Sequence, residues 1–114
     1  MTPRAATPRP PWHLRPATRR WWAQAAADWN FEEHHLRLLT LAGEHWDRAT
    51  AAREALARHG LTFTDRLGTP RPRPEVAIGR DAAVIFARLL RELRLDVEPD
   101  DPRPPGLNGG RTHA

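Results

Sequence analysis

The sequence predicts a mainly α fold: a three-helix core with a long central helix, a short hairpin-like arm between helices two and three, and disordered N- and C-terminal tails. Two observations support this prediction. Apolar residues recur at the 3.6-residue period of an α-helix over three stretches. The 12 prolines, which interrupt helices, lie outside the interiors of these stretches. They divide the chain into a basic Pro-rich arm (1–15), a helical domain (16–96) and a Pro- and Gly-rich tail (97–114).

The first helix is expected over residues 17–28. Pro16 suits a first helical turn, because its missing N–H has no helical partner to lose there. Tryptophans at helical spacing pack in cores more often than they stack on bases, so Trp22, Trp29 and Trp46 are predicted to be structural. The apolar side of this helix consists of Trp21, Trp22, Ala25, Ala26 and Trp29.

The second helix is expected to run from Phe31 to His59, roughly 43 Å at ~1.5 Å per residue. Asn30 is its predicted cap, because Glu33 stands three residues later as in a capping box. Gly60 suits the position after the last turn. Glutamates four residues before arginines support the outer face of this helix in three pairs, which are Glu33–Arg37, Glu44–Arg48 and Glu54–Arg58.

Three polar side chains, His35, His45 and Arg53, interrupt the apolar side of this long helix. A buried polar or charged group without a partner is costly, so each needs a partner from the third helix or from a second copy of the chain. A helix longer than about 25 residues is also typical of coiled coils and assemblies. The expected interface between copies consists of His35, Leu39, Trp46, Arg53 and Leu56.

The arm between the second and third helices begins with Leu61–Thr64, which alternates apolar and polar residues like a short strand. A turn follows, and then the Pro-rich segment 69–74, which cannot donate a full ladder of hydrogen bonds. Any returning strand is therefore an edge strand or a polyproline segment. The third helix is expected to start at Pro74 or Glu75 and to run to about Leu95.

The positive charge is unevenly distributed. The 18 Lys+Arg residues, all of them arginine, exceed the 14 Asp+Glu and give a formal net charge of +4. Residues 1–27 contain five arginines and no acid, and residues 61–80 are again positive. Arginine pairs bidentately with phosphate, but GC-rich coding and a solubilising tail would produce the same composition. The predicted DNA contacts are Arg4, Arg9, Arg15, Arg19, Arg20, Arg66, Arg71 and Arg73.

No enzyme, cofactor or metal site is expected. The chain contains no cysteine, serine or lysine, which excludes disulfides, thiol and serine nucleophiles and a P-loop. One cluster of metal-ligating residue types contains Glu32, Glu33, His34, His35, Glu44 and His45. The spacing of its histidines does not match that of metalloproteases. We interpret the cluster as the start of a helix, where the acids lie near the positive end of the helix dipole and the histidines pack within the chain or against another subunit. No segment approaches the ~20 apolar residues of a membrane span, so a soluble, intracellular protein is expected.

The order and spacing of these features resemble the small subunit of a tailed-phage terminase over roughly residues 11–96. The segments that carry the resemblance are Pro11-Trp12-His13-Leu14, Thr18-Arg19-Arg20-Trp21-Trp22, Leu38-Leu39-Thr40-Leu41-Ala42-Gly43-Glu44, Asp47-Arg48-Ala49, His59-Gly60 and Leu93-Arg94-Leu95. The resemblance implies a helical, ring-forming, non-catalytic protein that acts in the host cytoplasm. It also implies three kinds of partner: double-stranded viral DNA, further copies of the chain, and the large subunit that holds the ATPase and nuclease.

The sequence departs from this family at the end of the last helix. The family often closes that helix with Leu-Gly-Leu, whereas this chain places Arg94 between Leu93 and Leu95. It also lacks a helix-turn-helix signature, so the resemblance assigns no DNA-reading element. An alternative interpretation is a helical protein-interaction module, such as an antitoxin-like regulator, which would bind one protein partner and need no ring. A metal hydrolase built on the histidine cluster is the least favoured interpretation.

Overall fold

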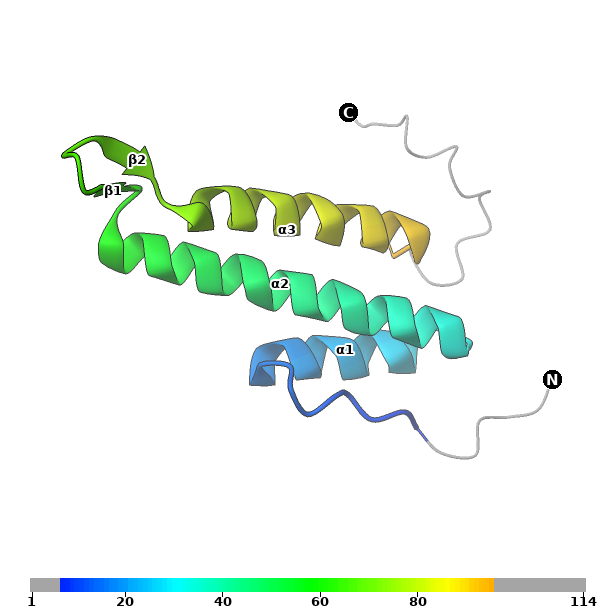
Figure 1. The fold of residues 1–114 in the computed structure, drawn as a ribbon. Coiled ribbons are helices and arrows are strands. Elements are labelled where there is room, and N and C mark those ends of the chain that lie inside the picture. The colour runs from blue at the N-terminus through cyan, green and yellow to red at the C-terminus, as the bar shows by residue number, and fades with distance from the viewer. Residues whose placement is uncertain (1–6, 96–114) are drawn as a thin grey trace, which may run out of the picture.

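The computed structural model describes residues 7–95 and confirms the predicted three-helix fold. The long helix α2 (Glu33–His59) is central, with α1 (Pro16–Asp28) on one side and α3 (Pro74–Glu92) on the other (Figure 1). The three extents agree with the apolar periodicity of the sequence to within a few residues. The predictions made for residues 1–6 and 96–114 lie outside the described residues, whereas residues 7–15 of the predicted N-terminal arm are described.

The connection between α2 and α3 is a two-stranded antiparallel hairpin that projects past the ends of the two helices (Figure 1). Its strands are β1 (Thr62–Thr64) and β2 (Pro70–Pro72), and Phe63 pairs with Arg71 at the centre. All residues of both strands are exposed, so the hairpin does not pack on the helices. The predicted hairpin-like arm is therefore confirmed, and its returning segment is an edge strand.

The prolines of β2 leave the ladder of hydrogen bonds intact. In an antiparallel pair, hydrogen-bonded and non-hydrogen-bonded residue pairs alternate. Next to the turn, the N–H of Asp65 donates to the carbonyl of Thr69 at 3.0 Å. The adjacent pair, Thr64 with Pro70, is therefore a non-hydrogen-bonded pair, as is the pair that contains Pro72. Both prolines thus stand where an N–H would point away from β1, and the outer edge of β2 has no donor at either position.

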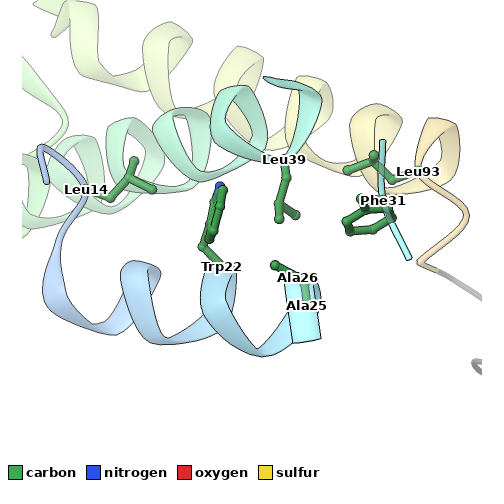
Figure 2. Close-up of a cluster of buried hydrophobic side chains, with 7 residues drawn as sticks. All are labelled: Leu14, Trp22, Ala25, Ala26, Phe31, Leu39 and Leu93. Atoms are coloured by element: carbon green, nitrogen blue, oxygen red, sulfur yellow. The ribbon is translucent and has the colours of Figure 1, made fainter. Parts of the chain in front are cut away.

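The core lies where α1 packs on the first half of α2 and on the end of α3 (Figure 2). Its buried side chains are Leu14, Trp22, Ala25, Ala26, Phe31, Leu39 and Leu93. Leu39 is fully buried, and Trp22, buried as predicted, donates its indole N–H to the Thr40 hydroxyl at 3.1 Å. Burying one leucine contributes about 1.5–3 kcal/mol. Because Leu14 belongs to this core, the ordered unit begins before Pro16.

The cap of α1 comes from α2 and not from its own neighbours in the sequence. Arg15 is the N-cap residue and makes no side-chain cap bond, and Pro16 fills the first helical position as predicted. Asp47 of α2 supplies the missing acceptor. One of its carboxylate oxygens accepts the backbone N–H of Arg15 at 2.9 Å, and the other accepts the Thr18 hydroxyl at 2.5 Å. An acceptor at a helix start is typically worth about 1 kcal/mol.

Helix α1 approaches α2 closely at Gly43. A Cβ at this position would lie 3.1 Å from a methyl carbon of Leu14 and 3.1 Å from the methyl carbon of Thr18. Both neighbours are buried and cannot move aside easily. A larger residue here would force both neighbours to shift by a few tenths of an ångström.

The predicted Asn30 cap of α2 is wrong. The helix begins at Glu33, two residues later than expected, and Glu32 is the N-cap residue. Phe31, expected to be the first helical residue, is instead buried in the core and lies before the helix. Glu32 and His35 form the capping box, in which the N–H of Glu32 donates to His35 Nδ1 at 3.1 Å. The predicted end of α2 at His59 is confirmed.

The predicted ion pairs along α2 are only partly formed within the described residues. Glu33 and Arg37 pair at 3.2 Å as expected. Glu44 instead pairs with His13 at 2.8 Å, and Glu54 also reaches across to the segment that precedes α1. This segment therefore uses acids of α2 that were expected to serve only that helix.

Helix α3 starts as predicted but ends at Glu92, three residues before the expected Leu95. Arg94 has a φ of +61°, in the left-handed region that glycine usually occupies. Its N–H donates to the carbonyl of Arg91 at 3.0 Å, and the N–H of Leu95 donates to that of Leu90 at 2.9 Å. This is the bonding pattern of a Schellman motif, with an arginine in the position where glycine is commonest.

Candidate assembly surface and nucleic-acid interface

The three helices meet around an open apolar pocket of about 340 Å³. Phe86 of α3 contributes to its wall, and the centroid of its ring lies 5.0 Å from that of Trp46 and 5.9 Å from that of Trp21. Trp29 packs against the core as predicted, whereas Trp46, which its spacing assigned to a core, is 46% exposed. Exposed aromatic surface of this kind is typical of interaction sites. The pocket is lined by Ala17, Thr18, Trp21, Trp46 and Phe86.

The five residues predicted to form an interface between copies share one side of α2 but differ in exposure. His35 caps its own helix, and Leu39 is fully buried in the core of its own chain, so neither position is available as predicted. Leu56 is half-buried, while Trp46 and Arg53 are exposed. The difference arises because α1 covers only the first half of α2 (Figure 1). Trp46 and Arg53 therefore remain the candidates for contact with another molecule.

His45, one of the polar residues on the apolar side of α2, has a buried ring nitrogen. Its Nδ1 is buried and has no hydrogen-bond partner within residues 7–95. Burial, aided by the charge of Arg48, lowers the pKa of His45, so the ring is neutral at pH 7. The rings of His34 and His35 lie 4.1 Å apart, but no group of three or more metal-ligating side chains gathers in the described part of the chain. None of the described helices combines the length and the apolar character needed to cross a membrane.

The hairpin brings three of the predicted DNA-binding arginines together. Arg66 is exposed at the turn, Arg71 is exposed at the centre of β2, and Arg73 is half-buried at its base. Asp65 pairs with Arg71 at 2.9 Å. The N–H of Thr69, and then Arg71, lower the pKa of Asp65, so this carboxylate is ionised and stays bound within the turn. Arg66 is thus the arginine of the hairpin that projects without an acidic partner among the described residues.

Two arginines predicted to bind DNA are used inside the chain. The guanidinium of Arg15 donates to both carboxylate oxygens of Glu54 at 3.1 Å, and this hydrogen bonding lowers the pKa of Glu54. Arg19 donates to the carbonyl of Trp12 at 3.1 Å. The first bonds hold Arg15 against α2, and the second ties the segment before α1 to α1 itself. Both reduce what Arg15 and Arg19 can offer to phosphate.

The remaining predicted contacts fall into two groups. Arg9 and Arg20 are exposed, and neither has an ion pair in the part of the chain that the structure describes. Arg4 lies outside the described residues. Among the described arginines that were predicted to bind DNA, Arg9, Arg20 and Arg66 are exposed and without an ion pair, and the half-buried Arg73 has none either.

Sequence reasoning missed both the role of Asp47 and the aromatic pocket. Asp47 caps a helix that begins 31 positions earlier in the chain, and only the docking of α1 brings the two together. Phe86 lies on α3, and nothing local in the sequence indicates that it meets Trp21 and Trp46. The one signal in the sequence was the content of five tryptophans, of which Trp12 and Trp46 are exposed.

Comparisons with known protein families, with curated proteins and with solved structures find no match for this chain. The surfaces described above are therefore the basis for its proposed function.

Proposed function

We propose that the chain is a terminase small subunit-like adaptor. In this role it binds double-stranded viral DNA as a homo-oligomeric ring in the host cytoplasm, and presents that DNA to the large ATPase and nuclease subunit. The observation that carries the proposal is the open aromatic pocket at the junction of the helices. A single copy leaves Trp46 46% exposed there, which a neighbouring subunit would cover. The basic hairpin beyond the helices supports the DNA-binding part of the proposal.

The assembly is tested by measuring the mass of the purified protein with light scattering at micromolar concentration. We expect a discrete oligomer well above the 13.0 kDa chain. Trp46→Arg places a charge in the pocket and should shift the mass toward the monomer without loss of helicity. Trp12→Arg is the matched control, because Trp12 is 84% exposed and lies outside the pocket. A wild-type protein that is strictly monomeric contradicts the proposal.

DNA binding is tested by fluorescence anisotropy on a duplex over a range of salt concentrations. Each phosphate contact contributes about 0.9 to the slope of log affinity against log salt. Replacing Arg66, Arg71 and Arg73 with glutamine should weaken binding to all sequences and reduce that slope. Arg37→Gln with Arg48→Gln is the control, because these exposed arginines lie on α2 away from the hairpin.

The same pocket also favours a second candidate, a protein-interaction module such as an antitoxin-like regulator. An apolar cleft of about 340 Å³ with aromatic walls suits an anchoring side chain from a partner helix. Co-precipitation with the product of a neighbouring large-terminase gene would support the adaptor. Capture of a different single partner by a monomer, without any DNA binding, would support the module.

A further inference from the structure

The hairpin tip presents a leucine to solvent from a fixed turn. Leu67 is 89% exposed, more than any other large apolar side chain in the described chain. One carboxylate oxygen of Asp65 accepts the N–H of Leu67 and that of Thr69, both at 2.9 Å. Gly68, with a φ of +82°, completes the reversal of the chain. The turn therefore holds Leu67 at the far end of the hairpin instead of letting it fold back.

Positive charge surrounds this apolar tip. Three arginines and one aspartate give residues 61–73 a net charge of +2. Arg66 stands beside Leu67, and Arg71 lies along β2 behind it. The one acid, Asp65, is bound by Arg71 and by backbone N–H groups of the turn, so it does not face outward as a free charge. A partner that accepts both an apolar side chain and guanidinium groups fits this tip.

The strand edges restrict the form of the partner. Pro70 and Pro72 leave the outer edge of β2 without N–H donors at these positions, so no third strand can extend the sheet on that side. On the β2 side the hairpin therefore remains a two-stranded ribbon, with the exposed Leu67 at its tip. β-Ribbons enter the grooves of DNA, and minor-groove proteins insert apolar side chains such as leucine between base pairs.

We propose that the hairpin enters the minor groove of double-stranded DNA with Leu67 as an apolar wedge between two base pairs. Arg66 then lies against the phosphates that flank the opened step. This inference rests on the proposed DNA binding and specifies how it occurs. Insertion partly unstacks the base pairs and bends the duplex. Any DNA in which the step is already unstacked is therefore bound more tightly.

The test compares two end-labelled duplexes of the same sequence with the full-length protein. One is fully paired, and the other carries a two-nucleotide mismatch at its centre, where the cost of unstacking is already met. Affinity is measured by anisotropy and bending by energy transfer between the two ends. We expect the wild-type protein to prefer the mismatched duplex about tenfold and to bend the paired one, because unstacking a step is costly.

Leu67→Ser should abolish both the preference and the bending while leaving salt-dependent binding in place. Leu67→Met, which keeps an apolar wedge, should retain both effects. Leu61→Ser is the matched control, because Leu61 is 64% exposed at the base of the hairpin. Circular dichroism confirms that each variant is folded.

Three results overturn the inference. In the first, the wild-type protein binds the paired duplex without preferring the mismatched one, and Leu67→Ser leaves DNA bending unchanged. The wedge is then wrong, and the proposed DNA binding stands. If Leu67→Ser lowers the oligomeric mass and leaves the DNA preference unchanged, the tip contacts protein instead. If the wild-type protein binds no duplex even at low salt, the proposed DNA binding fails, and the wedge fails with it.

Discussion

Replacing Arg94 with glycine is expected to stabilise the protein. Arg94 closes α3 with a φ of +61°, a conformation that costs an L-residue about 1–2 kcal/mol. Its side chain is exposed, so truncation removes no packing. Glycine gains flexibility in the unfolded chain, which offsets about 0.4–1 kcal/mol of the benefit. At mid-range values the net expected gain is about 0.8 kcal/mol, or about 3–6 °C in Tm for a domain of this size.

The measurement is thermal unfolding followed by circular dichroism at 222 nm. All variants are compared at one protein concentration, because any assembly would make Tm depend on concentration. Arg88→Gly is the first control. Arg88 is exposed within the right-handed part of α3, so glycine there should cost about 1 kcal/mol. Arg94→Ala is the second control, since it removes the charge but keeps the Cβ, and it should change Tm little.

Two results would refute this reasoning. If Arg94→Gly destabilises the protein as Arg88→Gly does, then Arg94 is not held in the left-handed conformation. If Arg94→Ala stabilises as much as Arg94→Gly, the gain comes from removing charge and not from relieving the backbone.

Three further predictions test the contacts that position α1 and the hairpin. Asp47→Ala removes both acceptors at the start of α1 and should lower the free energy of unfolding by about 1–2 kcal/mol. Urea unfolding measures this loss, and an unchanged free energy would mean that α1 does not need this cap. Gly43→Val should lower the free energy of unfolding by about 1–3 kcal/mol through overpacking. Ala51→Val, at an exposed position of the same helix, should lower it by about 0.5 kcal/mol. Equal losses would exclude the close approach of α1 to α2 at Gly43. The pKa of Asp65 is lowered, so its stabilisation of the turn is fully present above the ordinary value of 3.8 and is lost as pH falls through the lowered one. NMR titration of the Thr69 amide should show this loss, and Asp65→Asn should remove the pH dependence.

The helices were predictable because their signals are local. Each has its own apolar period, and a glycine or a proline marks three of the six helix ends: Pro16 and Pro74 begin helices, and Gly60 ends one. These residues act through backbone geometry that no distant contact has to supply. The start of α2 was missed because Phe31 is buried in the core before the helix begins, a tertiary placement that the capping preference of Asn30 does not indicate.

The surfaces were less predictable than the helices because they depend on how the helices dock. Leu39 and Trp46 occur on the same apolar side of α2, yet one is fully buried and the other is 46% exposed. The difference arises from the extent of α1. This helix covers Leu39, but only its first turn lies beside Trp46. Charge pairing followed the same rule: Glu54 is bound by Arg15 of the preceding segment, which competes with the arginine on its own helix.

The hydroxyl of Thr18 joins the cap of α1 to the wall of the aromatic pocket. Thr18 lines the pocket while its hydroxyl is bound to Asp47, which directly follows Trp46, another wall residue, on α2. Sliding α1 along α2 would break this bond and the one from Arg15, so Trp21 is held at a fixed distance from the other rings. The pocket is therefore preorganised. An occupant that fits it loses little conformational entropy from the protein side, so affinity follows shape complementarity and not induced closure.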